Sequence, residues 1–385
     1  MAPAARLRLF YLLYYGNVGA FLPYFAAYLR GLGFTGEQIG AVMMLPSLAG
    51  PAVAVGWAAW ADRSAAPARA LRRATAWAAA CALALPFVRT PATVGAVLLA
   101  QALGDRAVIP LVDSSTLEWC RTDPAHSYAR IRLFGSVGFI ALTVGLGLAL
   151  SARGDRPADL LVPLVAVACV AGYAAIARTL PPVPIRSGPR PGLADLRALF
   201  RDRAFLALVA ACAVHWAACA PFHLLFGVFV RERGLPADVT GYGMAAGVAA
   251  EVAVLLAFPR LERRLDVPTL FAVAFAGTAV RWALTSRAVN APEIVSLQLL
   301  HGLTFGLFWA TAMKALAAAV PAPLRATGQA LFSAAALGGA NAAGYFLAGL
   351  GYDRFGGVAP LFAWAAALEI VPLALAWRSI KAAQP

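Results

Sequence analysis

Three residues that rarely occur inside long apolar stretches stand in three successive apolar segments of this sequence: Glu251, Arg281 and His301. A charge in the middle of a membrane costs about 2.5–3.5 kcal/mol on insertion scales, so each of them needs a partner. A carboxylate, a guanidinium and a titratable imidazole form the combination that membrane proton relays use. The pattern therefore predicts a proton-coupling cluster. The alternative is a buried, hydrogen-bonded triad that only fixes helix packing.

A second pair of charges lies in the first half of the chain. Asp113 stands near the end of one apolar segment and Arg132 begins the next, so the two could face one another in a helical hairpin. Phe139 follows Arg132 by seven residues and shares its helix face, which makes its ring a candidate stacking surface for substrate. For the two charges, the alternative is a structural ion pair or an arginine that reaches the membrane surface.

Four more polar residues are candidates for substrate binding. Asp105 and Arg106 are adjacent, and Asp105 precedes Asp113 by eight residues on roughly the same helix face. They could tune substrate choice or form a local charge pair. Asn17 and Tyr24 belong to the first apolar segment and are candidate pocket residues, although a tyrosine near a helix end is often an interface anchor.

The composition indicates whether these residues fold in water or in a lipid bilayer. Of 385 residues, 61% are hydrophobic and 13% charged, with a mean hydropathy of +0.74. Soluble domains are about 45–50% apolar and about 25% charged. An excess of this size implies lipid as solvent. The net charge of +14 does not form a basic patch or stripe, because the basic residues fall between apolar segments, and we expect no nucleic-acid partner.

A bilayer core of about 30 Å requires about 20 apolar residues per helix. At that length the sequence predicts an all-α integral membrane protein with twelve transmembrane helices in two six-helix bundles related by pseudo-two-fold symmetry. The predicted spans are 7–29, 38–60, 71–88, 92–117, 132–151, 159–179, 205–230, 239–259, 268–286, 293–314, 326–350 and 358–378. Two histidines of the seventh span, His215 and His223, are interpreted as core residues, the more frequent outcome for histidines in apolar surroundings; the alternative is that they line the solute pocket.

The halves are also related by internal repeats. Segment 28–40 aligns with 229–241 at an offset of 201, and segment 61–63 aligns with 261–263 at an offset of 200. We therefore expect an N-terminal bundle over 1–180, a cytoplasmic linker with an amphipathic surface helix over 181–203, and a C-terminal bundle over 204–385. A parallel repeat of this kind is typical of transporters with a solute site at the midplane, between the two halves.

Orientation follows from the basic residues. With a cytoplasmic N-terminus, 20 of the 32 lysines and arginines fall on the cytoplasmic side and eight on the opposite side. Because cytoplasmic loops are enriched in basic residues, both termini are predicted to be cytoplasmic, in a bacterial inner membrane.

Several stretches resemble the major facilitator superfamily. Ala61-Asp62-Arg63 resembles its loop signature, with Ala58 and Ala66 in place of two glycines. Segments 21–25 and 130–139 and the series Glu251, Arg281, His301 are similar in order and spacing to the lactose permease group. Segments 109–113, 281–282 and 299–305 are more similar to its phenylpropionate-permease relatives. The resemblance covers nearly the whole chain.

This resemblance implies a proton-coupled symporter of a small organic solute that works by alternating access. Asp113 and Arg132 would orient the polar groups of the substrate, while Glu251, Arg281 and His301 would couple it to the proton. An aromatic carboxylate of the phenylpropionate type is the first expected substrate, because an arginine could hold its charge. A sugar or a nucleoside is the second, and facilitated diffusion without a proton remains an alternative.

Three positions depart from the sugar carriers. Those proteins have a lysine three residues before the histidine and a glutamate three residues after it, where this chain has Gln298 and Thr304. They also have a glutamate at the position of Asp113. Because the glutamate that Thr304 replaces handles the proton in those carriers, the departure leaves the protonated acid of this chain open.

We interpret a last group of charged residues as gating residues. Two acid-plus-arginine pairs follow the second and the eighth predicted helix at their cytoplasmic ends. We expect them to cap neighbouring helices and latch the outward-open state. The four residues are Asp62, Arg63, Glu262 and Arg263.

Other classes of protein lack support in the sequence. No HExxH, GxSxG or phosphate-cradling motif occurs, so we expect neither catalytic residues nor a cofactor. Five cysteines without a CxxC pair are interpreted as small packing residues, and no metal site is predicted. A non-transporting membrane sensor is the alternative of a different class, although such proteins usually carry a soluble domain. The expected partners are the solute, the proton and the lipid bilayer, and we expect a monomer.

Overall fold

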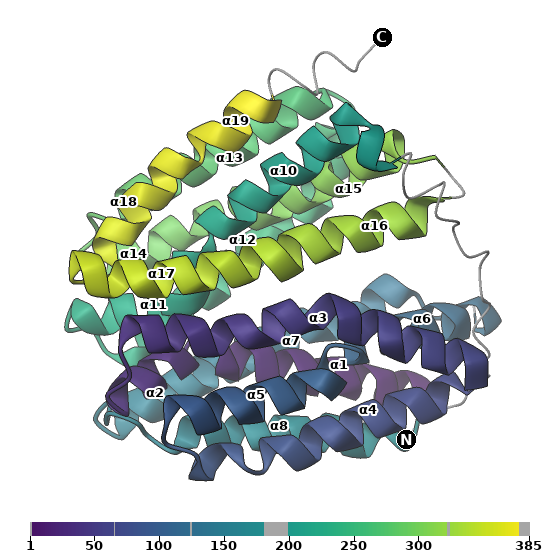
Figure 1. The fold of residues 1–385 in the computed structure, drawn as a ribbon, viewed down its shortest axis with the longest axis horizontal. Helices are drawn as coiled ribbons and strands as arrows, with labels where there is room; N and C mark the ends of the chain where they lie inside the picture. The colour runs from purple at the N-terminus through teal and green to yellow at the C-terminus, as the bar shows by residue number, and fades with distance from the viewer. Residues whose placement is uncertain (1, 65, 124, 181–198, 322–323, 377–385) are drawn as a thin grey trace. The chain divides into compact units, whose positions relative to one another are not determined.

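The computed structural model describes residues 2–64, 66–123, 125–180, 199–321 and 324–376, and every regular element within these ranges is helical. The chain divides into two compact units. We call them the N-terminal unit (Met1–Gly188 with Pro236–Gly241) and the C-terminal unit (Pro189–Leu235 with Tyr242–Pro385). Figure 1 draws the first mainly in purple and blue and the second mainly in teal, green and yellow. Most of the linker predicted over 181–203, with its surface helix, lies outside the described residues.

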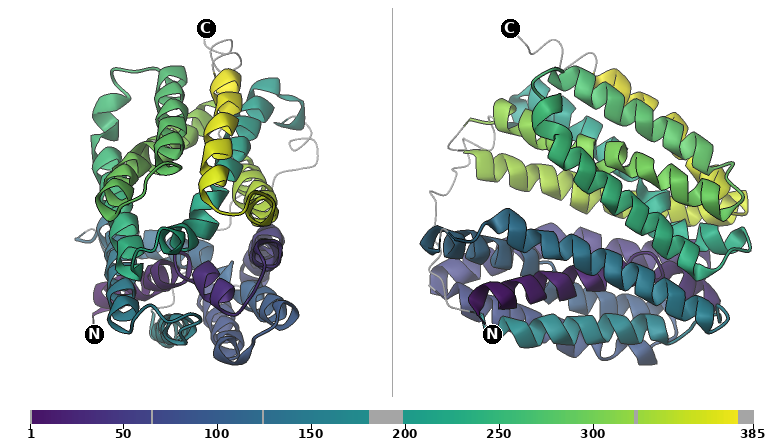
Figure 2. Two further views of the ribbon diagram at one scale, coloured as in Figure 1. Left: turned by 90° about the vertical axis from the view of Figure 1, so that its left-hand side faces the viewer. Right: turned by 180° about the vertical axis from the view of Figure 1, so that it is seen from behind.

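The helices of the N-terminal unit are α1 (Pro3–Phe21), α2 (Phe25–Gly31), α3 (Gly36–Ser64), α4 (Pro67–Ala82), η1 (Leu85–Phe87), α5 (Pro91–Asp105), α6 (Val108–Thr122), α7 (Tyr128–Ala152) and α8 (Leu161–Ala177). Those of the C-terminal unit are α10 (Arg203–Ala218), α11 (Ala220–Glu232), α12 (Ala237–Leu261), α13 (Val267–Thr285), α14 (Ala291–Leu297), η2 (Gln298–Leu300), η3 (Gly302–Leu307), α15 (Phe308–Ala319), α16 (Arg325–Ser333), η5 (Ala334–Ala340), α17 (Asn341–Phe355), α18 (Ala359–Leu368) and α19 (Ile370–Leu375). The first residues of α12 belong to the N-terminal unit. Within each unit the long helices run side by side in the views of Figure 2.

Eight helical stretches of the described residues are long and apolar enough to cross a membrane. Two further apolar helices, Leu161–Ala177 and Ala359–Leu375, are shorter. The prediction of an all-helical chain with membrane-spanning segments is therefore confirmed for the described residues. The number of twelve and the symmetry of the two bundles stay predictions.

Several spans that the sequence presents as continuous are interrupted. The first breaks between α1 and α2 at Pro23, and the seventh breaks between α10 and α11, where Pro221 stands in the first turn of α11. Proline has no backbone N–H to donate to the preceding turn, which explains both breaks. Two other spans contain π-helical segments, η3 and η5, which are wider turns that often mark functional sites.

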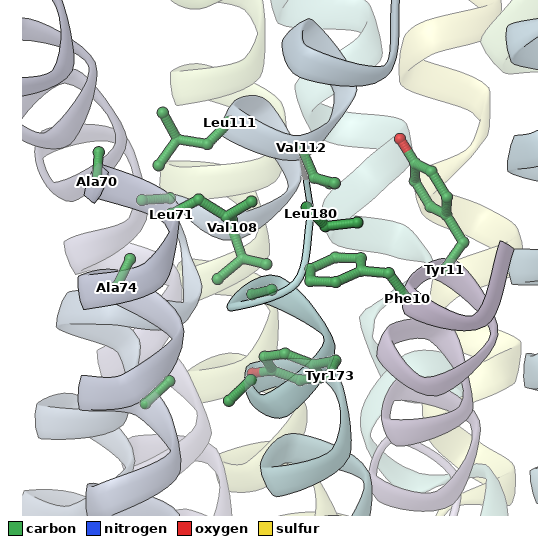
Figure 3. Close-up of a cluster of buried hydrophobic side chains, with 14 of the residues drawn as sticks. Phe10, Tyr11, Ala70, Leu71, Ala74, Val108, Leu111, Val112, Tyr173 and Leu180 are labelled. Atoms are coloured by element: carbon green, nitrogen blue, oxygen red, sulfur yellow. The ribbon is translucent and has the colours of Figure 1, made fainter. Parts of the chain in front are cut away.

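The core of the N-terminal unit is aromatic where α1 meets α8. Phe10, Tyr11 and Tyr173 are fully buried there and pack with Val108 and Leu71 of α6 and α4, as Figure 3 shows. Helix α1 packs against both α7 and α8. The close approach to α7 depends on Gly138, since a Cβ at that position would collide with the carbonyl oxygen of Leu12.

The core of the C-terminal unit is built from phenylalanines. Phe205 of α10, Phe271 and Phe275 of α13 and Phe308 of α15 are all fully buried in one cluster. Phe271 and Phe275 stack with ring centroids 5.3 Å apart. This cluster packs α10, α13 and α15 against one another.

Candidate functional site

Glu251, His301 and Arg281 lie together in the C-terminal unit. Glu251 Oε2 is 3.8 Å from His301 Nε2, and His301 Nδ1 is 3.1 Å from Arg281 Nη1. Arg281 Nη2 donates to Gln298 Oε1 at 2.5 Å. Because a guanidinium can only donate, Nδ1 of His301 must be the acceptor, and the ring proton on Nε2 then faces Glu251. We call these four residues the Glu251–Gln298 chain.

Along the Glu251–Gln298 chain, the side chains change from partly exposed to fully buried. The side chain of Glu251 is 21% exposed and that of His301 is 12% exposed, whereas Arg281 and Gln298 have no exposed surface. The Arg281 guanidinium lies 4.3 Å from the ring centroids of both Phe222 and Trp282. These aromatic faces stabilise a cation that water does not reach. The buried arginine therefore supplies a fixed positive charge behind a titratable acid and imidazole.

Helix α12 is shaped to bring Glu251 to this place. Gly243, Gly247 and Glu251 recur every four residues, so they share one face of the helix. A Cβ at Gly247 would stand 3.2 Å from the Cβ of His301, and a Cβ at Gly243 would stand 3.3 Å from the side chain of Gln298. The two glycines let α12 approach closely enough for Glu251 to reach the imidazole.

In the N-terminal unit, Asp113 and Arg132 are joined through tyrosines of α1. The Tyr11 hydroxyl donates to Asp113 Oδ1 at 2.6 Å and lies 3.2 Å from Thr116 Oγ1. The Arg132 guanidinium is 3.9 Å from the ring centroid of Tyr15 and 5.5 Å from that of Tyr11, and it also donates to the Tyr15 hydroxyl. Asp113 and Arg132 make no direct ion pair in the part of the chain that the structure describes.

Asp105 and Arg106 separate rather than pair. Asp105 accepts a hydrogen bond of 2.7 Å from the Tyr173 hydroxyl, whereas Arg106 is exposed and follows the end of α5. Among the ion pairs of the described residues, none joins Asp105 to Arg106. The sequence predicts that Asp105 and Asp113 share roughly one helix face. The structure places them on two different helices, because α5 ends at Asp105 and α6 begins at Val108.

The three remaining candidates have different surroundings. The Tyr24 hydroxyl is bonded to the carbonyl oxygen of Thr143 at 2.7 Å, and the side chain is 3% exposed. Asn17 keeps a buried Oδ1 without a hydrogen-bond partner, which leaves an acceptor for a ligand or a water molecule. Phe139 is partly exposed, and its ring stacks on no other ring of the described residues. Partial exposure of the ring is compatible with the predicted stacking role.

The gating candidates are described only in part. Asp62 and Arg63 belong to the last turn of α3, but their side chains lie outside the described residues. Glu262 Oε2 accepts from Lys314 Nζ at 3.0 Å, which ties the end of α12 to α15. Arg263 is exposed just beyond α12.

Sequence reasoning missed one polar cluster. Glu369, between α18 and α19, lies 2.9 Å from Nδ1 of His215 through its Oε1, and both side chains are fully buried. His215 is thus a core residue, as interpreted, but one with an ionisable partner. The available signal was a lone carboxylate in the last apolar span, comparable to that of Glu251.

Together, the helical fold, the apolar spans and the buried charges define a multi-pass membrane protein of the transporter class. A sequence profile described as the MFS_1 like family matches residues 4–363. The chain belongs to this family, within the major facilitator superfamily. The family consists of transporters, and the chain is not an enzyme.

Relatives agree with this class. The chain is similar to a probable 3-phenylpropionic acid transporter of Escherichia coli (strain K12), with 28% identity over 354 residues that cover 91% of each protein. A putative nucleoside transporter, YegT, of the same organism is 24% identical over 248 residues, 60% of this chain and 57% of that protein. The crystal structure of the nucleoside transporter NupG shares the fold, with a TM-score of 0.87 at 16% identity over 99% of this chain and 100% of the other.

Proposed function

We propose that this chain is a proton-coupled symporter of a small organic solute, and that the solute is an aromatic carboxylate of the phenylpropionate type. The Glu251–Gln298 chain is the observation that carries the proposal. It combines an acid that partly reaches solvent with an imidazole and a buried cation, so a proton on Glu251 changes the charge balance of the whole cluster. The likeness to a probable 3-phenylpropionic acid transporter supports the substrate class.

The N-terminal unit supplies the features that such a solute needs. Arg132 can hold a carboxylate by charge-assisted hydrogen bonds, and the partly exposed ring of Phe139 follows it by two helical turns on α7. Tyr11 and Tyr15 hold Asp113 and Arg132 in place. A nucleoside is the second candidate, because its hydroxyl groups could donate to Asp113, and YegT is a putative nucleoside transporter.

The proposal is tested with purified protein in liposomes whose interior is made alkaline. The wild type is expected to accumulate labelled 3-phenylpropionate faster than protein-free liposomes do. That subtraction is essential, since the protonated acid can itself diffuse through lipid. A wild type that exchanges the solute but ignores the pH gradient would instead be a uniporter or use another ion.

Phe139→Ala is expected to weaken solute binding roughly two- to tenfold, because an aromatic pair contributes about 0.5–1.5 kcal/mol beyond the area that it buries. The measurement is the concentration dependence of counterflow. Leu133→Ala is the matched control, since Leu133 is on the same helix and 49% exposed. An unchanged half-saturating concentration in Phe139→Ala would remove this ring from the site.

Orientation is tested at two exposed loop positions of the C-terminal unit. We expect Arg264→Cys to be cytoplasmic and Arg287→Cys to be periplasmic, as the distribution of basic residues predicts. A membrane-impermeant maleimide should label Arg287→Cys in intact cells and Arg264→Cys only after lysis, with the parental protein as the background for the five native cysteines. The reverse pattern would invert the topology.

A further inference from the structure

The His215–Glu369 cluster has a hydrogen-bond pattern that calls for a proton. Glu369 offers both carboxylate oxygens to His215 Nδ1, at 2.9 and 3.0 Å. On the other side of the ring, Nε2 is 3.0 Å from the carbonyl oxygen of Thr304. A carbonyl oxygen can only accept, so Nε2 must carry a hydrogen. The proton between Nδ1 and Glu369 is then the one that determines whether the cluster is satisfied.

The two possible states differ in charge and in contacts. With that proton present, the pair is net neutral and both sides of the imidazole are bonded. When the imidazolium releases it to water, a neutral ring and a carboxylate remain, and a nitrogen lone pair must face either Glu369 or the Thr304 carbonyl. Both arrangements leave the Glu369 carboxylate without a neutralising cation, and either that carboxylate or the Thr304 carbonyl oxygen then faces a nitrogen lone pair, which is costly in low-dielectric surroundings.

Few other ionisable groups surround the pair. Cys219 Sγ is 3.8 Å from His215 Nε2. His223 of α11 packs on the ring of Trp216 of α10, with centroids 5.3 Å apart. Phe308 and Phe275 enclose the imidazole, with ring centroids 4.1 and 5.2 Å away. The other charges on the helices packed against α10 stand near helix ends or have partners elsewhere: Arg231, Glu232, Lys314, Asp353 and Arg354.

A metal ion fits this cluster less well than a proton. Ligand atoms of His215, Cys219 and Glu369 lie within 4.8 Å of one another. However, Nδ1 already faces the carboxylate and Nε2 the carbonyl oxygen of Thr304, so an ion on either nitrogen would have to displace one of these contacts.

Thr304 connects this cluster to the residues around Glu251 in the same unit. It lies in the π-helical segment η3, which begins directly after His301. The carbonyl oxygen that His215 holds is therefore three residues from the imidazole that faces Glu251. A π-helical turn can relax to an α-helical one with a shift of its carbonyl groups. The hydrogen bond from His215 to the Thr304 carbonyl oxygen therefore affects the position of His301.

We propose that His215 and Glu369 form a second proton-binding site, and that its proton holds the η3 segment, and with it His301, in position beside Glu251. The inference deepens the proposed function, on which it rests for the role of the proton in transport. Because the pair has no exposed surface, its proton exchanges only when the surrounding helices separate. Exchange is thereby confined to one stage of the transport cycle.

The test is a pH titration of imidazole nitrogens by nuclear magnetic resonance, with the protein in lipid bilayers. The chain has four histidines, so selective nitrogen labelling gives four rings, which single substitutions assign. We expect His215 to give imidazolium signals that convert to those of a neutral ring as the pH rises, with a simultaneous shift of the His301 signals. In Glu369→Gln the imidazolium form of His215 should be lost, whereas Glu293→Gln, an exposed control, should leave it unchanged.

A neutral His215 ring at every pH, or an imidazolium that persists in Glu369→Gln, would overturn the site. A titrating His215 without a change at His301 would overturn the link through η3. Since this titration needs no solute, its outcome is separate from that of the uptake experiment. A wild type that titrates at His215 but ignores a pH gradient refutes the symport proposal. A wild type that responds to the gradient but does not titrate at His215 refutes the second site.

Discussion

Glu251→Gln is expected to abolish solute accumulation driven by a pH gradient, while counterflow at equal pH partly survives. Glutamine has the shape of a protonated glutamate and no charge, so it mimics one state of the acid and cannot reach the other. In the Glu251–Gln298 chain, the neutral amide can still face His301 Nε2, as the carboxylate does at 3.8 Å. Solute exchange with Glu251 protonated would therefore continue, without net proton movement.

The measurement compares two assays on one preparation of proteoliposomes. Uptake with an alkaline interior reports coupling, and counterflow reports solute binding and the conformational cycle. Glu293→Gln is the matched control, because its carboxylate is exposed and accepts from the backbone N–H of Val289, just before α14. Should Glu251→Gln accumulate solute at the wild-type rate above protein-free liposomes, Glu251 is not the coupling acid.

The sequence predicts the Glu251 cluster because of a physical asymmetry. A charged residue within twenty apolar ones is unfavourable unless the fold provides a partner, so its position alone marks it. Three such residues on successive spans imply that they meet, and they do so within one unit. The amide of Gln298 carries no comparable signal, because a glutamine in an apolar span can satisfy itself through backbone carbonyls, as it does here with Ile294 at 2.8 Å.

The contacts of the N-terminal unit are harder to foresee. The spacing allows Asp113 and Arg132 to face one another, but it does not reveal that tyrosines of α1 contact both side chains. Tyrosines are common in membrane spans as anchors, so their type and position do not reveal which hydroxyl meets which acid. The same holds for Glu369, whose partner His215 is 154 residues away along the chain. Hydropathy locates each span but does not define which faces of two distant spans meet.

The interruptions of the spans are also only partly predictable from the sequence. The break at Pro221 has a local cause that the sequence displays. The π-helical turns η3 and η5 do not, since a glycine-rich helix can stay regular or widen according to what packs against it. In η3, Gly302 and Gly306 allow α12 to approach closely, as a Cβ on either would meet backbone atoms of Ala250 or Glu251 at 2.9–3.1 Å.

Two variants in the N-terminal unit, each tested with two solutes, distinguish the substrate classes. Arg132→Gln is expected to weaken binding of 3-phenylpropionate about tenfold or more, since a hydrogen bond to a charged group contributes about 1.5–3 kcal/mol. Asp113→Asn should weaken it less, because the Tyr11 hydroxyl can still donate to the amide oxygen, and the solute carboxylate gains nothing from Asp113. For a nucleoside, uridine for example, the order reverses, because its hydroxyl groups donate to Asp113 and it carries no charge for Arg132.

Binding is measured as the half-saturating concentration in counterflow with both labelled solutes. Arg130→Gln is the matched control for the loss of a positive charge, because Arg130 is exposed in the first turn of the same helix, whereas the Arg132 guanidinium stacks 3.9 Å from the Tyr15 ring centroid. A larger loss for 3-phenylpropionate in Arg132→Gln supports the aromatic carboxylate. A larger loss for uridine in Asp113→Asn assigns the chain to nucleosides, and equal small losses in both variants would place the solute away from these two residues.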